Sequence, residues 1–432
     1  MKQYSTCKNS GIEWIGRIPQ SWNFKRLKYL DRTIMGQSPE SDDCNRDEAG
    51  VPFLQGNADF SSLNPIPNVW CKHPNKLAEK NDILLSVRAP VGAVNIADQT
   101  YGIGRGLCAI RPKRSNKKYS YYRVLCLSDE LNRISTGSTY SAVSVEQVNN
   151  VVVPDPAFEE QEALSAFLDR KTIQIDDLIA KKERMIELLK EERIAIINQA
   201  VTKGLDPNVE MKESGIEWLG RIPKHWDVKR LKYLSKKIGS GVTPKGGASV
   251  YQFDGVLFLR SQNIHFDGLR LDDVAYISQE VHDNMIGSKV FAGDVLLNIT
   301  GASIGRCYYY PENLGEANVN QHVCIIRPNK FALTKYLTYC LSSELGQQQI
   351  INNQNGISRE GLNFEELSTF VLPMPDYNEQ KKITKFIDNK ISLVAEQIKS
   401  EQKSIELLKE YRSALVSEVV TGKIDIRETV KC

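Results

Sequence analysis

The sequence lacks several features that would assign a protein directly to a class. No apolar run approaches the roughly 20 residues that cross a bilayer, so we expect no membrane-spanning segment. The amino terminus has no basic segment followed by an apolar stretch, which argues against a secretory signal. The composition, 41% hydrophobic and 25% charged, is that of an ordinary globular protein. These observations predict a soluble cytoplasmic protein with no membrane partner.

Metal-binding and redox motifs are also missing. The nine cysteines form no C-x-x-C pair, and the five histidines form no H-E-x-x-H or similar pairing. We therefore predict no metal site, reduced cysteines that mostly pack in the core, and histidines with ordinary polar roles at the surface or in the core.

The chain carries little net charge, +3 over 432 residues. The affinity of sequence-independent DNA binding increases with the number of phosphates that lysine and arginine side chains neutralise. We expect such binding to be weak here unless the charge is unevenly distributed.

No catalytic motif is complete. The run GSGVTPKGG from Gly239 resembles a phosphate loop but lacks the Gly-Lys-Ser/Thr ending that places the lysine and the magnesium-binding hydroxyl. The segment DPAF from Asp155 resembles the Asp/Asn-Pro-Pro-Tyr/Phe motif of amino-methyltransferases, but the second proline is missing and no glycine-rich cofactor loop accompanies it. A proline-rich turn between a strand and a helix fits this segment better. The sequence therefore predicts no catalytic residue.

What the sequence does contain is an internal repeat. Residues 8–30 read KNSGIEWIGRIPQSWNFKRLKYL and residues 212–234 read KESGIEWLGRIPKHWDVKRLKYL, which agree at 17 of 23 positions. A second pair, VVVPDPAFEEQ from Val151 and FVLPMPDYNEQ from Phe370, opens two segments that stay in register through IELLKE. The offset is 204 residues for the first pair and 219 for the second, so the variable region of the second copy is 15 residues longer. The chain therefore consists of two tandem copies of one unit.

Between the repeated segments the two copies diverge. A faint similarity remains between NDILLSVRAPVGAVN from Asn81 and GDVLLNITGASIGRC from Gly293, and between CAIRP from Cys108 and CIIRP from Cys324. The ILL and VLL runs, with turn residues on either side, are typical of strands. Each variable region is predicted to be a domain of mixed α and β structure.

Two long helices are predicted, because residues 159–202 and 378–421 contain no glycine or proline and are rich in helix-forming residues. Apolar residues recur with a period of seven, which is typical of a coiled-coil seam. The predicted seam comprises Leu168, Ile175, Leu189 and Ile196 with Ile179, Ile186 and Ala200, and Ile387, Val394, Leu408 and Leu415 with Ile398, Ile405 and Val419. The two helices are expected to pack against each other as an antiparallel coiled coil if a pseudo-two-fold axis relates the copies.

One polar residue interrupts the seam in each helix, Lys182 in the first and Glu401 in the second. These positions are equivalent and near the middle of each helix, so antiparallel pairing would bring them together. Either they form a register-setting ion pair, or the two long side chains reach solvent independently.

The motif S-G-I-E-W-I/L-G-x-I-P-x-x-W and the motif P-x-P-x-x-x-E-Q before a long helix each occur twice. This combination resembles the specificity subunit of Type I restriction-modification systems, over nearly the whole chain. The resemblance implies an α/β (mixed α+β) chain in which two target recognition domains each read half of a split DNA site, while the helices space them. The implied divisions are recognition domain 1 at 1–157, a spacer helix at 158–205, recognition domain 2 at 206–376, a second spacer helix at 377–425 and a tail at 426–432.

The resemblance also implies the partners. They are double-stranded DNA, two methyltransferase (modification) subunits docked on the helices, and restriction motor-nuclease subunits. S-adenosylmethionine, ATP and Mg are expected on these partner subunits, and no cofactor on this chain. The chain itself would then be a non-catalytic recognition subunit, which agrees with the missing catalytic motifs.

Candidate DNA-binding residues are polar residues in predicted turns of the variable regions. Base edges favour arginine for guanine and asparagine or glutamine for adenine, while hydroxyl groups help to hold phosphates. The candidates are Gln55, Asn57, Arg88, Arg105, Ser138, Thr139 and Tyr140 in the first copy, and Arg260, Gln262, Asn263, Thr300, Asn320, Gln321, Ser358 and Arg359 in the second. An ordinary turn or solvent-exposed role is the alternative for each.

Four tryptophans, Trp14, Trp22, Trp218 and Trp226, repeat at equivalent positions in the shared segments. Stacking on bases is one possible role. Because these residues are shared while the variable regions differ, anchoring of each domain to a helix end is the better interpretation.

Two other functions are alternatives to this interpretation. A non-catalytic scaffold that binds two protein ligands could carry the same duplicated architecture, since +3 is a modest charge. A self-contained nuclease or methyltransferase would require motifs that the sequence lacks.

Overall fold

The computed structural model describes residues 3–135, 142–354 and 361–427. The chain folds into two compact units, of which unit 1 combines Met1–Lys182 with Lys403–Cys432 and unit 2 is Glu183–Gln402. Each unit therefore contains one globular domain and parts of both long helices. In the described part of the chain, no helix is long and apolar enough to span a membrane.

The domain of unit 1 is built on two sheets. The first is antiparallel, in the order β10, β9, β12, β4 (Val94–Ile96, Ile83–Ser86, Leu107–Pro112 and Asp31–Met35). The second has the order β5, β7, β6, β11, β8 (Cys44–Asn45, Val69–Cys71, Val51–Leu54, Tyr101–Ile103 and Leu77–Ala78), with β6 and β11 parallel. The predicted strand at the ILL run is confirmed as β9.

Strand β9 is apolar on both faces because both faces are covered. Leu84 packs with Leu54 and Ile103 of the second sheet, whereas Ile83 and Leu85 pack on the other side with helix residues. A strand covered on both sides has no solvent face, which explains a continuous apolar run in place of an alternating one.

Three short helices complete this domain: α1 (Lys117–Leu125), α2 (Ser128–Ile134) and α3 (Val145–Asn150). The side chain of Asn116 accepts hydrogen bonds from the first backbone N–H groups of α1, and Ser144 forms a capping box with Gln147 at the start of α3. Two ribbons, β1 with β2 (Cys7–Asn9, Arg17–Pro19) and β3 with β13 (Asn23–Arg26, Val152–Asp155), and the 3-10 turns η1 to η3 (Leu27–Tyr29, Ser41–Asp43, Asn57–Asp59) complete the unit.

Unit 2 repeats this topology. Its first sheet has the order β24, β23, β26, β17 (Cys307–Tyr309, Val295–Asn298, Val323–Pro328 and Ser235–Ser240). Its second sheet has the order β21, β18, β25, β22 (Ala275–Ile277, Val256–Leu259, Ala317–Val319 and Lys289–Val290), with β18 and β25 parallel. The mixed α and β structure predicted for both variable regions is confirmed.

The remaining elements of unit 2 follow the same plan. The ribbons are β14 with β15 (Met211–Glu213, Arg221–Pro223) and β16 with β27 (Asp227–Arg230, Val371–Met374), and the equivalent helices are α6, α7 and α8 (Thr334–Ser342, Glu344–Gln354 and Phe364–Thr369). The 3-10 turns are η4 to η9 (Leu231–Tyr233, Gly247–Val250, Ser261–Asn263, Ile286–Ser288, Gly301–Ser303 and Glu312–Leu314). The hairpin β19–β20 (Ile264–His265, Gly268–Leu269) and helix α5 (Gln279–Asn284) have no counterpart in the described part of unit 1, and they lie in the longer variable region.

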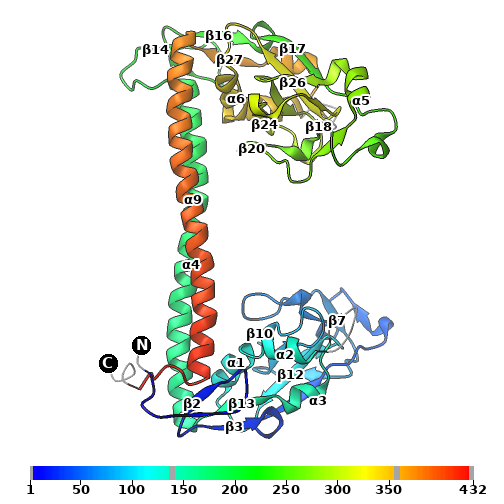
Figure 1. Cartoon of the computed structure of the whole chain (residues 1–432), viewed down its shortest axis with the longest axis vertical. Helices are drawn as coiled ribbons and strands as arrows, with labels where there is room; N and C mark the ends of the chain where they lie inside the picture. Colours follow the sequence, from blue (N-terminus) through cyan, green and yellow to red (C-terminus); the bar gives the residue numbers. More distant parts are fainter. Residues whose placement is uncertain (1–2, 136–141, 355–360, 428–432) are drawn as a thin grey trace. The chain divides into compact units, whose positions relative to one another are not determined.

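The two predicted long helices are α4 (Phe158–Lys203) and α9 (Tyr377–Val420), and part of each lies beside part of the other within each unit (Figure 1). In unit 1, Arg412 of α9 forms an ion pair with Asp176 of α4 at 2.8 Å. In unit 2, the late part of α4 and the early part of α9 share one apolar core, to which Ile197, Ala200, Ile383 and Ile387 contribute. Late α4 thus meets early α9, and the antiparallel arrangement is seen in both units.

The seam prediction is confirmed at most positions and wrong in detail at a few. The predicted seam residues are buried except Ile196, Ile398 and Leu408, which are only partly buried, and Ile197 is buried in place of Ile196. A straight helix of 3.6 residues per turn drifts against a seven-residue repeat, so a neighbouring position takes over the contact. Lys182 falls in unit 1 and Glu401 in unit 2, so their pairing stays a prediction.

Candidate nucleic-acid interface

The loops that carry the candidate residues of unit 1 meet at one edge of its two sheets. The backbone N–H of Gln37, after β4, donates to Ile103 at the end of β11 (2.9 Å). The N–H of Gly106 donates to the carbonyl of Gln55, after β6 (3.2 Å). Gln55 and Arg105 are therefore close in space, and both side chains are exposed.

Glycine makes this close approach possible in both units. A Cβ atom on Gly36, directly after β4, would lie 2.1 Å from the carbonyl oxygen of Gly104. The equivalent Gly241, directly after β17, would place a Cβ atom 1.7 Å from the carbonyl oxygen of Val319. The run GSGVTPKGG is thus the loop that closes the edge of the sheets in unit 2, and GQSPE from Gly36 is its counterpart in unit 1.

Arg88 lies at the same edge of unit 1. The N–H of Val87 donates to the carbonyl of Gly106 (2.9 Å), and Arg88 forms a β-bridge with Ala142. Within the described residues neither Arg88 nor Arg105 has an ion-pair partner, so two exposed guanidinium groups face solvent near Gln55. Asn57 begins the short turn η3 and is partly buried.

Five candidates lie outside the described residues: Ser138, Thr139, Tyr140, Ser358 and Arg359. The described residues that follow them, Ala142 and Leu362, lie at the sheet edges of unit 1 and unit 2 described above. Ala142 pairs with Arg88, and the N–H of Leu362 donates to the carbonyl of Ile299 (2.8 Å) next to Thr300.

In unit 2 the structure brings together Thr300, Asn320 and Gln321. The N–H of Asn320, after β25, donates to the carbonyl of Leu259 at the end of β18 (3.1 Å). The N–H of Ile299, after β23, donates to the carbonyl of His322 (3.0 Å). Gln321 is exposed, whereas Asn320 is 9% exposed and its Oδ1 accepts from the N–H of His322.

A second group of candidates in unit 2, Arg260, Gln262 and Asn263, forms hydrogen bonds with other residues of the same unit. Asn263 is buried, and its amide donates to the carbonyl of Arg270 and accepts from the N–H of Arg260. Gln262 donates to the carboxylate of Asp273 (2.8 Å), and Arg260 donates to the carbonyl of the same residue (2.9 Å). These contacts stabilise the turn after β18. Base contact stays a prediction for this group, as for all the candidates.

Sequence reasoning missed His322. Its ring lies between two candidates, with Nδ1 2.6 Å from Oγ1 of Thr300 and Nε2 3.1 Å from Nε2 of Gln321. The histidines were expected to have ordinary polar roles, yet this one joins the loops after β23 and β25. Its position directly after Asn320 and Gln321 in a predicted turn was the available signal.

Repeated tyrosines and carboxylates anchor each domain to the helices. In unit 1, Lys118 and Tyr122 of α1 contact Asp169 of α4 at 2.5 and 2.8 Å. In unit 2, Lys335 and Tyr339 of α6 contact Asp388 of α9 in the same way. Burial raises the pKa of both tyrosines, so they act as neutral hydrogen-bond donors.

The shared E-Q pair has a structural role that the sequence alone did not reveal. The buried side chain of Gln161 accepts from the N–H of Asn116 (2.8 Å) and donates to the carbonyl of Pro156 (2.9 Å). Gln380 repeats both contacts, with Leu333 and Pro375 (2.8 and 3.1 Å). Each glutamine joins the first turn of a long helix to the start of a domain helix.

Two of the four tryptophans are buried anchors, as predicted. Trp22 and Trp226 are fully buried, and Nε1 of Trp226 donates to Glu379 in the first turn of α9 (3.0 Å). Trp14 is partly buried and Trp218 is 47% exposed, so the anchoring prediction does not hold equally for this pair.

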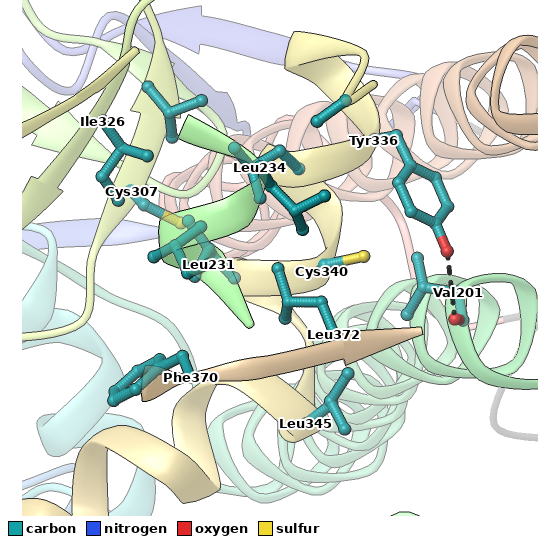
Figure 2. Packing of buried hydrophobic residues seen from close by; sticks show 14 of the residues in the cluster. Val201, Leu231, Leu234, Cys307, Ile326, Tyr336, Cys340, Leu345, Phe370 and Leu372 are labelled. Atoms are coloured by element: carbon teal, nitrogen blue, oxygen red, sulfur yellow. Dashed lines mark hydrogen bonds between the residues drawn. The ribbon is translucent and has the colours of Figure 1, made fainter. Parts of the chain in front are cut away.

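Figure 2 shows the core that joins the domain of unit 2 to the helices. Tyr336 of α6 points toward α4, and its hydroxyl lies 3.4 Å from the carbonyl oxygen of Val201 and 2.9 Å from that of Pro373. Leu231, Phe370 and Leu372 pack in the same cluster, which places the repeated LKYL segment next to the ribbon strand β27. This core thereby attaches the domain that carries the candidate residues to both long helices.

Comparison with known proteins identifies relatives of the whole architecture. Residues 19–188 and 223–408 match the Type I restriction modification DNA specificity domain, once in each copy. The chain is 24% identical over 429 residues to the type I restriction enzyme MjaIX specificity subunit of Methanocaldococcus jannaschii, covering 96% of both chains. It is 24% identical over 387 residues to the EcoBI specificity subunit of Escherichia coli, covering 86% of this chain and 79% of that protein. A provisionally named MjaX specificity subunit is 36% identical over 196 residues, but this match spans only 44% of each chain.

Solved structures share the fold. A chain from work on complex assembly and conformational transition of the type I R-M system superposes with a TM-score of 0.70 at 16% identity, covering 94% of this chain and 99% of that one. The HsdS subunit from Thermoanaerobacter tengcongensis gives a TM-score of 0.51 at 17% identity, covering 96% of this chain and all of that one.

Proposed function

The chain belongs to the family of Type I restriction modification DNA specificity domains, and from this premise we propose that each of its units reads one short DNA word. The two words would be separated by unread base pairs. One observation carries the proposal: the same sheet edge occurs in both units but presents different polar residues. Gln55, Arg88 and Arg105 lie at the edge in unit 1, and Thr300 and Gln321 lie there in unit 2.

The chemistry of these side chains suits base readout. Arginine pairs with guanine, and glutamine pairs with adenine, by two hydrogen bonds at the major-groove edge. Two different sets of such residues favour an asymmetric, two-part site over a palindrome.

The helices are proposed to serve as spacer and docking surface. In each unit they bury apolar seam residues, yet they also expose large apolar side chains: Ile173, Leu178, Leu407 and Tyr411 in unit 1, and Met185, Leu188, Ile194, Phe386 and Leu393 in unit 2. Exposed apolar residues along a helix pair favour further helices as partners. We propose that these are helices of two modification subunits.

The chemistry would belong to those partners. We propose that modification subunits bind S-adenosylmethionine and transfer the methyl group, and that motor-nuclease subunits use ATP and Mg. This chain would supply sequence recognition alone.

The test is to express the chain with its modification subunits in a host without adenine methylation and to map the methylated adenines. We expect one motif with two words and a gap of fixed length. Replacing residues 31–150 by the equivalent region of another specificity subunit should change one word and leave the other intact. Methylation without a two-part motif would contradict the proposal, and methyl transfer by the purified chain alone would contradict a purely recognising role.

A further inference from the structure

The amide of Gln321 is exposed, yet two neighbours hold it in place. The hydroxyl of Thr243 donates to its Oε1, and its Nε2 donates to Nε2 of His322 (3.1 Å). An amide nitrogen can only donate, so Nε2 of His322 accepts and the ring proton is assigned to Nδ1. Nδ1 then donates to Oγ1 of Thr300 (2.6 Å). The chain of hydrogen bonds fixes both the plane and the orientation of the amide.

The fixed amide keeps one donor and one acceptor free. A glutamine amide has two N–H groups and two oxygen lone pairs, and the two neighbours use one of each. Adenine presents the complementary pair in the major groove, an N6 amino donor beside the N7 acceptor. A preset side chain also avoids the entropy cost of ordering a free glutamine when DNA binds.

We propose that Gln321 reads an adenine in the word of unit 2, and that Thr243 and His322 are positioning residues for this contact. The inference rests on the proposed function, because it assigns one base within one of the two words. It also gives a role to GSGVTPKGG, whose threonine supplies the orienting hydroxyl.

The repeat provides independent support. Thr243 belongs to a Gly-x-Thr-Pro turn after β17, and Gly36-Gln37-Ser38-Pro39 stands at the equivalent place after β4. Ser38 holds a glutamine too, since Nε2 of Gln55 donates to its Oγ at 3.0 Å. Gln55 follows β6, however, whereas Gln321 follows β25. Both units therefore have a hydroxyl side chain that contacts a glutamine, but the glutamine lies in the loop after β6 in unit 1 and in the loop after β25 in unit 2.

Gln262 is a less suitable residue for base contact than Gln321. It is also exposed at this end of unit 2, but its Nε2 donates to the carboxylate of Asp273 at 2.8 Å. That contact places a negative charge beside the amide, which disfavours approach of the DNA backbone.

The experiment uses the full chain with its modification subunits and maps methylated adenines genome-wide. In the variant Gln321→Ala we expect the preference for A·T at one position of one word to fall about tenfold or more, because both hydrogen bonds are lost. Thr243→Val removes the hydroxyl at similar volume and should relax the same position to a smaller degree. Thr243→Ser keeps the hydroxyl and should preserve the motif. Gln279→Ala, at an exposed glutamine of α5, is the matched control and should also preserve it.

The outcomes separate the two levels of the argument. If the wild-type complex methylates adenines without a two-part motif, the proposed function is wrong, whatever the variants show. A wild-type motif that persists in Gln321→Ala and Thr243→Val would overturn the adenine assignment alone. Changes at several positions, or in the other word, would also overturn it, since they indicate distortion of the domain. If Thr243→Val folds poorly by thermal melting, His322→Phe removes the second positioning contact and should relax the same single position.

Discussion

The hydroxyl of Tyr119 donates a hydrogen bond to the backbone carbonyl of Val420 at 3.4 Å, although 301 residues separate them in the chain. The hydroxyl of the equivalent Tyr336 lies at the same distance from the carbonyl oxygen of Val201, and it also donates to the carbonyl of Pro373 at 2.9 Å. Each long helix ends against the domain of the other copy in sequence. The two copies are therefore interlocked, because the first domain binds the end of α9 and the second domain binds the end of α4.

Removing either hydroxyl should destabilise its own unit. Both tyrosines are fully buried. Tyr119→Phe removes the hydroxyl from the carbonyl of Val420, and Tyr336→Phe removes it from the carbonyls of Pro373 and Val201. We expect each variant to lose about 1 kcal/mol of unfolding free energy in denaturant titrations. Tyr29→Phe, at a 59% exposed position, is the control. If the buried variants match this control, these contacts do not contribute to stability.

The repeat, the long helices and the class of fold could be predicted from the sequence, because they depend on local features. A stretch without glycine or proline and with a seven-residue apolar period specifies a long helix whatever it packs against. Contacts such as Tyr119 with Val420 depend on how distant segments meet, and no local pattern encodes them. The shift from Ile196 to Ile197 is of the same kind, since the domain of unit 2 shares the core with Ile197.

The candidate site could be predicted only as a set of loops. Turn residues such as Gln55 and Gln321 were found because turns have strong signals. Which side chain is free and which is used by the fold depends on neighbours a few ångströms away. Asn263 and Gln321 are the same kind of candidate in the sequence, yet the first is buried in backbone hydrogen bonds and the second is exposed.

A buried ion pair distinguishes unit 1 from unit 2. Arg123 and Asp31 are both fully buried as side chains and lie 2.6 Å apart, whereas the equivalent positions in unit 2 hold Cys340 and Ser235. Arg123→Met should cost about 3–5 kcal/mol of unfolding free energy, because it leaves a buried carboxylate without its partner. The double variant Arg123→Cys with Asp31→Ser copies unit 2 and should recover part of this loss. Equal losses in the single and double variants would argue against this interpretation.

The same pair predicts a pH dependence of stability. Burial raises the pKa of Asp31 above its ordinary value, and the Arg123 guanidinium opposes this only in part. A raised pKa in the folded state means that the folded protein binds the proton more tightly than the unfolded chain does. The contribution of Asp31 to stability is therefore fully present below its unfolded pKa near 4 and is lost as the pH rises through the folded value. As the pH rises through this window, the unfolding free energy of the wild type should fall relative to that of Asp31→Asn. Urea unfolding at several pH values measures this difference. A shift in the opposite direction would mean that the ion pair outweighs burial.

Lys182 and Glu401 provide a test of helix register. If they pair, Lys182→Glu and Glu401→Lys should each lower the thermal midpoint, and the double exchange should restore most of it, since the opposite charges are retained. Exposed positions with the same charges, such as Lys181 and Glu410, supply the control exchange. If the decreases in the thermal midpoint simply add in the double variant, the two side chains do not pair.

The spacer role of the helices predicts how the recognised site responds to their length. Four residues added to the middle of both α4 and α9 lengthen each helix by about 6 Å, close to two base-pair steps of 3.4 Å. We expect the unread gap in the methylated motif to grow by about two base pairs while both words stay unchanged, because the edges that read them are not altered. Exchanging four exposed helix residues without changing the length is the control, and it should leave the gap as it was. A longer chain that methylates altered words across an unaltered gap would show that the helices do not set the spacing.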